Sequence, residues 1–344
     1  MKKILILIIL FTFLLSGSVS LARNQNKTIY VDDDGGVDFT RIQDAINAAS
    51  NGDTIFVYSG IYYENILIDK SIILQGEDKS STIIDGGGSG DVIYISSNEV
   101  TISGLTVKNS GINPDWNDPD AGIDVKSSNN NIYDIIADSN NNGIFIKSDE
   151  NKINNNVIQN NKRYGIFIYK SNKNIIEENE ITNNIKIFES FTGAGVFINE
   201  GYDCSIINNN FLDNSFGIIS GYSSKINITG NRITSDSTLL LYKGSNLLIE
   251  SNNIIGSILT IDDCKCDITH NNFLGFQNID LVGGTIYFEF GYFSIRKTDS
   301  KWYNNYWGRV YPFWKFIEPF DSSISGSIIY LDADTNPANN LFDI

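Results

Sequence analysis

The sequence has 344 residues and a formal net charge of −16, from 41 acidic residues against 25 lysines and arginines. This charge argues against nucleic acid and anionic membrane surfaces as partners. Only 5 prolines and 1 methionine occur, and Asn and Ile are abundant, which favours strands and turns over helices.

Residues 1–22 have the pattern of a secretory signal peptide. Two lysines precede an apolar run, and the small residues of Ser20-Leu21-Ala22 suit cleavage after Ala22. The alternative is an uncleaved membrane anchor, but the apolar run is short for a membrane span. We expect cleavage, which leaves no membrane span and places the mature protein outside the cytoplasm, secreted or at the cell surface.

Residues 23–53 predict an N-terminal cap. Apolar residues at 42, 45, 46 and 49 give one face of a short helix, and Thr40 with Gln43 fits a capping box. Such a helix would cover the exposed strand edges at the first turn of a repeat protein.

Residues 54–276 contain a repeat of about 22 residues, typical of a solenoid of short strands. We count about nine or ten coils. Six asparagines, each two positions before an apolar residue, mark the repeat: Asn156, Asn179, Asn210, Asn231, Asn252 and Asn271. A second row keeps the same step: Gly122, Gly143, Gly165, Gly195 and Gly217, with Thr238 next. We assign both rows to corners that need positive φ, and expect the Asn side chains to hydrogen-bond along the stack.

Alternation within the strands that follow the glycines predicts which side chains leave the coil. If Ile123 and its equivalents point inward, Asp124 and a row of aromatic residues point outward. This aromatic row is Phe145, Phe167 and Phe197, and the parallel outer row is Lys126, Lys147, Tyr169 and Asn199. Two interpretations stay open: an exposed platform for sugar rings, or a satellite core covered by an inserted loop or by the C-terminal aromatic segment.

Two insertions, residues 109–121 and 184–194, lead into strands of this face and are expected to wall a groove. The first holds Trp116, a further stacking surface, and three acids. Those acids are the candidate Ca²⁺ ligands, Asp115, Asp118 and Asp120. Weak catalytic candidates are Asp124, Lys126 and Lys147, since a lyase needs a basic side chain near carboxylates.

The period fails after residue 276, and the aromatic-rich residues 277–344 predict a C-terminal cap with closing strands. Cys204 lies about three coils from Cys264 and Cys266, too far for a disulfide. We interpret the cysteines as small core residues, with metal binding by the last two as the alternative. His270 occupies the corner position of Asn209, Gly230 and Ser251, so a turn residue is favoured over a catalytic base.

Four segments carry a family resemblance: Ala45-Ile46-Asn47-Ala48-Ala49, Gly52-Asp53-Thr54-Ile55, Gly60-Ile61-Tyr62 and Asn304-Asn305-Tyr306-Trp307-Gly308. They resemble right-handed parallel β-helix proteins of the pectin-lyase-like superfamily, and the Asn-rich coils resemble NosD-like and archaeal surface β-helix repeats. The resemblance implies an all-β, right-handed parallel β-helix. That fold hosts lyases, hydrolases, esterases, epimerases and non-enzymes, so it does not fix an activity.

Motifs of the enzymatic branches are missing. The Gln-Asp-Thr and Asp-Phe-Ile-Phe-Gly segments typical of pectin methylesterases do not occur, nor does the Gly-His-Gly typical of polygalacturonases. One Met and one His also fit poorly with the copper handling that a NosD-like resemblance implies. We expect a non-catalytic protein that needs no cofactor and binds polysaccharide, or another cell-surface glycan or protein, along the aromatic row. The alternative is a carbohydrate-active enzyme, a lyase, hydrolase or epimerase with or without Ca²⁺, acting in the groove.

Overall fold

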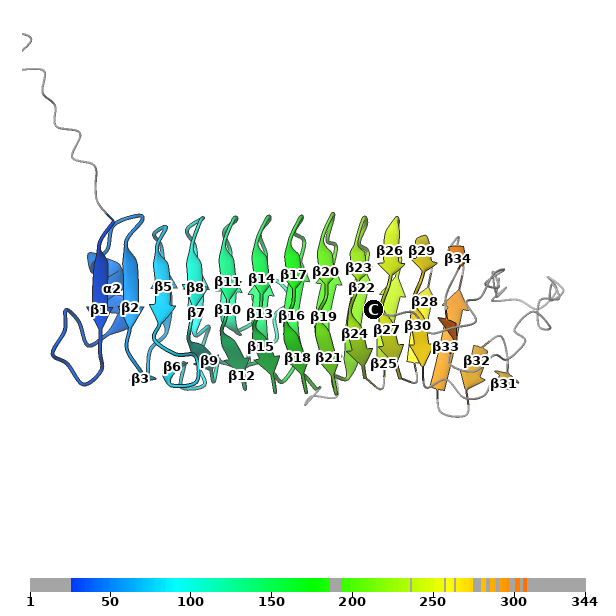
Figure 1. The fold of residues 1–344 in the computed structure, drawn as a ribbon, viewed down its shortest axis with the longest axis horizontal. Helices are drawn as coiled ribbons and strands as arrows, with labels where there is room; N and C mark the ends of the chain where they lie inside the picture. The colour runs from blue at the N-terminus through cyan, green and yellow to red at the C-terminus, as the bar shows by residue number, and fades with distance from the viewer. Residues whose placement is uncertain are drawn as a thin grey trace, which may run out of the picture.

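The computed structural model describes residues 26–185, 193–235, 237–256, 258–262, 264–274, 280–282, 285–288, 291–296, 301–303 and 306–307. In this part the chain forms a straight rod of stacked turns (Figure 1). The predicted signal, residues 1–22, and most of the predicted C-terminal cap lie outside it. No helix in the described ranges is long and apolar enough to span a membrane.

Three sheets form the sides of the rod, and consecutive neighbours in each are parallel except where stated below. Sheet A runs in the order β1 (Thr28–Val31), β2 (Thr54–Val57), β5 (Ile73–Gly76), β8 (Thr101–Ser103), β11 (Asn131–Tyr133), β14 (Lys152–Asn154), β17 (Ile175–Glu177), β20 (Ser205–Ile207), β23 (Asn227–Thr229), β26 (Leu247–Glu250), β29 (Cys266–Thr269) and β34 (Lys301–Tyr303). Sheet B runs in the order β3 (Gly60–Tyr62), β6 (Thr82–Asp85), β9 (Thr106–Lys108), β12 (Ile136–Asp138), β15 (Val157–Gln159), β18 (Glu180–Thr182), β21 (Asn210–Leu212), β24 (Arg232–Thr234), β27 (Asn253–Ile255), β30 (Asn272–Leu274) and β35 (Tyr306–Trp307).

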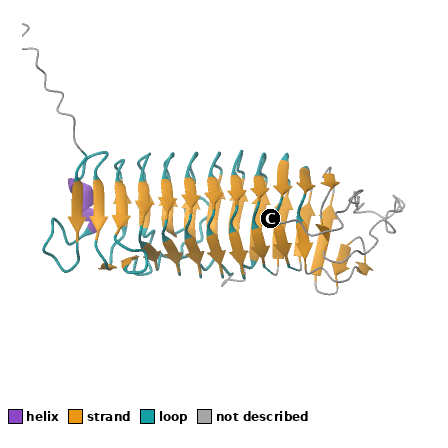
Figure 2. Cartoon of the chain, in the orientation of Figure 1, coloured by secondary structure: helices purple, strands orange, loops and turns teal. Residues whose placement is uncertain are grey.

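Sheet C runs in the order β4 (Ile66–Ile68), β7 (Ile93–Ile95), β10 (Ala121–Val125), β13 (Asn142–Ile146), β16 (Tyr164–Tyr169), β19 (Ala194–Asn199), β22 (Phe216–Gly221), β25 (Ser237–Tyr242), β28 (Ile258–Asp262), β33 (Gly291–Arg296), β32 (Thr285–Phe288) and β31 (Asp280–Val282). Each turn gives one strand to sheets A, B and C in that order, and about ten turns stack in the described ranges (Figure 2). The prediction of an all-β parallel β-helix is confirmed.

A single apolar core fills the rod. Alternate strand residues point inward and stack on their equivalents one turn away, as Ile123, Ile144 and Ile166 do in sheet C. A register shift between Ser237 and Leu239 changes this alternation at β25. Leu259 therefore pairs with Leu239 and lies in the core, although strict alternation along sheet C predicts that it points outward.

Parallel pairing continues beyond residue 276, where the sequence period ends. Strands β33, β34 and β35 pair in parallel with β28, β29 and β30 and add another turn. The antiparallel strands β31 and β32 are inserted before β33.

Asparagine side chains form hydrogen-bonded ladders at all three corners. In the longest, each amide oxygen accepts from the backbone N–H, and in most cases the side-chain N–H, of the residue one turn earlier. Its members are Asn156, Asn179, Asn209, Asn231, Asn252 and Asn271. The predicted ladder was wrong at one rung, because Asn209 and not Asn210 is the member, and Phe211 rather than Leu212 is the buried residue that follows.

The physical reason given for these rows also needs correction. Positive φ occurs one residue before a ladder Asn, as at Asn155 and Asn208, and His270 has this conformation. The glycine row instead provides space. A Cβ at Gly143 would lie 2.6 Å from the carbonyl oxygen of Gly165 and 2.8 Å from a ladder amide.

Helix α2 (Ile42–Ala48) lies against the first turns, and remote side chains cap it (Figure 2). Glu64 accepts hydrogen bonds from the N–H groups of Ile42 and Gln43 at 2.8 and 3.1 Å, and Lys70 donates to three carbonyls at the C-terminal end. The predicted capping box is wrong, because the N-cap residue is Arg41 and has no side-chain cap hydrogen bond.

The three cysteines are buried and form no disulfide, in agreement with a core role. Cys264 Sγ accepts a hydrogen bond from the N–H of Gly244, and burial raises the pKa of the Cys204 thiol to about 11.

Candidate functional site

The aromatic row of sheet C is stacked as predicted but is not exposed. Phe145, Phe167 and Phe197 occupy equivalent positions in β13, β16 and β19, and the Phe167 and Phe197 rings are stacked at 5.2 Å and 10°. All three are almost fully buried, and with Tyr164 and Tyr169 they form a second apolar cluster outside the coil. The expectation of an open platform is therefore wrong, and the alternative, a covered satellite core, describes the structure.

The inserted segment between β9 and β10 covers this row. Trp116 makes edge-on contacts with Phe167 and Phe197, at ring-centroid distances of 5.6 and 5.8 Å. The segment thus reaches over strands two and three turns further along the rod. The side chain of Trp116 nevertheless remains 40% exposed, so one part of the indole packs on the row while another meets solvent.

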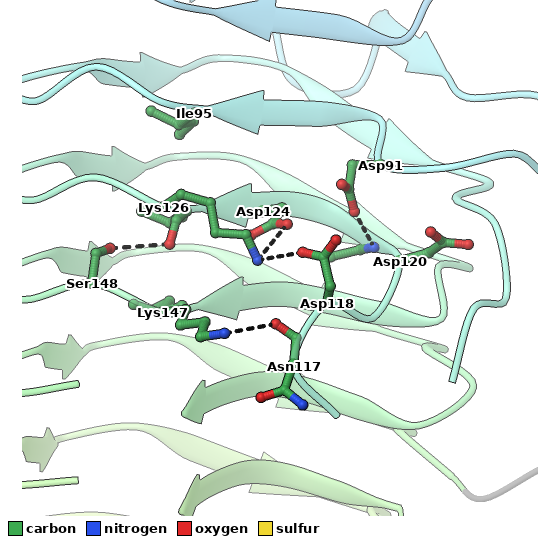
Figure 3. A network of polar contacts seen from close by, with 12 residues as sticks. Asp91, Ile95, Asn117, Asp118, Asp120, Asp124, Lys126, Lys147 and Ser148 are labelled. Carbon is green, nitrogen blue, oxygen red and sulfur yellow. Dashed lines mark hydrogen bonds and ion pairs between the residues drawn. The ribbon is translucent and has the colours of Figure 1, made fainter. Parts of the chain in front are cut away.

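Side chains from three successive turns of sheet C hold the segment. Lys126 Nζ lies 2.8 Å from Asp118 Oδ1, and Lys147 Nζ donates to the Asn117 carbonyl at 3.1 Å (Figure 3). Arg163 donates to the Pro114 carbonyl at 3.2 Å. The same cations contact aromatic rings: Lys126 lies 4.4 Å from the Phe145 centroid, and Arg163 lies 4.9 Å from that of Trp116. Lys126 therefore binds the row and its cover together, and so does Arg163, which also lies 5.9 Å from the Phe167 centroid.

Lys126 also contacts Asp124, which β10 points outward at the start of the aromatic row. The Lys126 ammonium lies 3.0 Å from Asp124 Oδ2, and the Asp124 side chain is only 1% exposed (Figure 3). Burial raises the pKa of Asp124 to about 8, although Lys126 lowers it. Burial opposes the charge on Lys126, but Asp124 and Asp118 outweigh it and raise the Lys126 pKa. Asp118 and Asp124 thus share one ammonium group, and burial makes Asp124 hold its proton more tightly than an exposed acid does.

Asp91 adds a second perturbed carboxyl at this end of the segment. Its Oδ1 accepts a hydrogen bond from the N–H of Ala121 at 2.8 Å, at the start of β10 (Figure 3). Burial raises the pKa of Asp91 to about 6, the Ala121 N–H lowers it, and Asp120 raises it. Two carboxyls with raised pKa values therefore lie beside the covered aromatic row.

The candidate Ca²⁺ ligands do not converge on a cation. Asp118 pairs with Lys126, Asp120 Oδ2 accepts from the N–H of Asn113, and Asp115 Oδ1 accepts from the N–H of Asn117. Among the described residues, no three His, Cys, Asp or Glu side chains form a group that could hold a metal ion. The predicted metal role of these acids is therefore not supported by their arrangement.

The remaining predicted residues lie at the edge of the covered row. Lys147 and Tyr169 follow one another in the second outer row, 5.7 Å from ammonium to ring centroid, and Asn199 pairs with Tyr169 and is half-buried. The second predicted wall, residues 184–194, lies largely outside the described ranges. Sequence reasoning missed Arg163 and Asp91. The sequence could have revealed both residues, because each lies just before a sheet C strand, at the corner from which the insertion also leaves.

Two family models match the sequence. The right-handed beta helix region matches residues 142–290, and the periplasmic copper-binding protein NosD matches residues 46–190. None of the curated proteins matches the chain.

Solved structures with the same fold share little sequence. The Dettilon tailspike protein is 13% identical with a TM-score of 0.57, over 72% of this chain and 55% of the tailspike, so the chain spans about half of that protein. The DFA-IIIase from Arthrobacter chlorophenolicus, solved with DFA-III, is 14% identical with a TM-score of 0.56, over 82% of each chain. XylC, solved with xylose, is 11% identical with a TM-score of 0.53, over 82% of this chain and 75% of XylC. The matched models and the parallel coil together identify the chain as a right-handed parallel β-helix protein of the pectin-lyase-like, NosD-like type.

Proposed function

We propose that the protein acts outside the cytoplasm and binds polysaccharide, without catalysis, on the outer face of sheet C. The observation that carries this proposal is the placement of Trp116, which is held against a stack of phenylalanines and yet presents part of its indole to solvent. A fixed, partly exposed aromatic ring beside hydrogen-bonding groups suits sugar rings, because it supplies apolar contact at a small entropic cost.

Two lines of comparison support this proposal at a coarser level. The tailspike, the DFA-IIIase solved with DFA-III and XylC solved with xylose share the fold, and two of them hold a saccharide. The NosD family is described as periplasmic, which agrees with the predicted signal peptide at residues 1–22. Copper binding is not part of the proposal, because the sequence has only one His and one Met to serve as imidazole and thioether ligands.

A carbohydrate-active enzyme is the second candidate, favoured by the raised pKa values of Asp124 and Asp91. A carboxyl that is still protonated at neutral pH is suited to act as a general acid. Against this, Asp124 is buried and contacts Lys126, so no substrate reaches it in this conformation. Release of reducing or unsaturated ends from a polysaccharide, lost in Asp124→Asn, would favour the enzyme.

The binding proposal is tested by the retention of purified mature protein on neutral and uronate polysaccharides, with and without Ca²⁺. Trp116→Ala should weaken retention at least tenfold, because it removes the exposed ring. Tyr63→Ala is the matched control, since Tyr63 is a more exposed aromatic residue near the N-terminal end of the rod. Equal retention of Trp116→Ala and the wild type would reject the assignment of the site to Trp116.

A further inference from the structure

The aromatic row beneath the inserted segment has the composition of a binding floor. Its rings project from three successive strands at the spacing of the turns, with Phe145, Phe167 and Phe197 in line. It lies outside the core of the coil, and the two clusters are separate. A chain of sugar rings can stack on a row of parallel rings that repeats about every 4.8 Å and has cations along its edge. The apolar core of the coil does not require such a row, because the two clusters are separate.

The inserted segment that covers the row is held by side chains, whereas the rest of the turn is held by paired strands. Residues 109–120, all within the described ranges, form no strand, and residues 112–118 are exposed. Its neck is closed by Asn113 and Asp120, whose backbone and carboxylate groups hydrogen-bond to each other. Beyond the neck it is held by the ends of long side chains, Lys126, Lys147 and Arg163. Such contacts break at lower cost than paired strands do.

We propose that residues 112–118 form a lid over a closed glycan-binding site, and that the Lys126–Asp118 ion pair is the latch of this lid. The floor of the site is the aromatic row, and Trp116 is the part of the lid against which a sugar chain stacks. This inference rests on the proposed function for the chemistry of the ligand. It adds that the bound conformation is a minor, open state, so the observed affinity is reduced by the fraction of molecules that are open.

The latch is tested with Asp118→Asn, which removes the carboxylate that pairs with Lys126 and leaves the aromatic floor and Lys126 in place. Amide hydrogen exchange of the peptide that covers residues 109–121, measured without ligand, should become faster. The affinity for a retained polysaccharide should rise about threefold to fivefold, the range expected when one partly exposed ion pair no longer opposes opening. The control is Lys152→Met, which removes an ion pair of the same 2.8 Å length, to Glu177, on sheet A.

The outcomes separate the two proposals. The lid is supported if Asp118→Asn shows faster amide exchange in residues 109–121 and tighter polysaccharide binding, and Lys152→Met shows neither change. Unchanged exchange overturns the latch whether or not a glycan binds. Faster exchange with unchanged or weaker binding overturns the closed site and leaves the Trp116 proposal standing. Failure of every polysaccharide to retain the wild type and the Asp118→Asn protein overturns the proposed function itself.

Discussion

Asp124 is a carboxyl group that the fold encloses beside a single ammonium group. An acid whose pKa is raised on folding binds its proton more tightly in the native state than in the unfolded chain. The contribution of Asp124 to stability is therefore fully present below the unfolded value, near 4, and is lost as the pH rises to the folded value of about 8. Asp91, whose pKa is raised to about 6, makes a similar contribution to stability, which is lost at a lower pH.

This sign gives a prediction for the interval from pH 6 to pH 8, where Asp124 dominates. The free energy of unfolding of the wild type should fall by up to about 2 kcal/mol across this interval, because one raised pKa changes stability by about 1.4 kcal/mol per pH unit. Asp124→Asn should remove most of this slope, as measured by chemical denaturation at a series of pH values.

Asp44→Asn, at an exposed position of the helix, is the control and should keep the wild-type slope. If Asp124 were ionised throughout, Asp124→Asn would instead lower stability by a similar amount at every pH and leave the slope unchanged. That result would contradict the raised pKa of Asp124.

At the scale of secondary structure, helix α2 protects the first sheet edge as well as covering the core. Gln43 acts as a substitute strand: its Oε1 accepts from the N–H of Leu67 at 2.7 Å and its Nε2 donates to the Leu67 carbonyl at 3.2 Å. Asp33 and Asp38 accept similarly from the N–H groups of Ile61 and Tyr30. At the N-terminal end of the rod, the edge strands β1, β3 and β4 thus each have a side-chain partner for a backbone N–H that would otherwise recruit another chain.

Replacing Gln43 by Ala should therefore expose the edge of β4. We expect the free energy of unfolding to fall by about 1–2 kcal/mol, from the loss of two backbone-directed hydrogen bonds, and self-association to rise. Denaturation and light scattering at increasing protein concentration measure the two effects. Gln159→Ala, in the interior strand β15, should not increase association, and equal association of the two variants would count against this role of Gln43.

On the scale of the whole molecule, the three ladders overlap only in part of the rod. The corner from sheet C to sheet A has Asn130, Asn151 and Asn174, after which Cys204 takes the position. The corner from sheet B to sheet C has a ladder from Asn140 to Asn214. All three ladders therefore run together through the turns that contain Asn151 and Asn174.

Those two turns should be the slowest to exchange amide hydrogens. Fully satisfied, buried side-chain networks reinforce one another, and stability in a stacked repeat is close to a sum of neighbour contacts. Exchange measured by mass spectrometry should accelerate from residues 151–184 towards both ends of the coil. A uniform rate along the rod, or the slowest exchange at β26 and β27, would contradict this gradient.

Much of this architecture could be predicted from the sequence, because a solenoid converts spacing into vertical neighbours. The inward isoleucines and the outward phenylalanines follow from alternation alone. Alternation could not decide whether Asn209 or Asn210 is the ladder member, because each lies two positions before an apolar residue. Burial of the phenylalanines was also undecidable, because it depends on Trp116 reaching across two and three turns. The same is true of the helix caps, whose partners Glu64 and Lys70 lie in the following turn.

The ladders also give the rod a direction. Every ladder oxygen accepts from the preceding turn, so the amide groups at all three corners are oriented alike, with their carbonyl ends towards the N-terminus. Equal orientation means that their dipoles add instead of cancelling. The rod is consequently polarised along the turns that the ladders span, and most strongly in the turns of Asn151 and Asn174, where the dipoles of all three corners add.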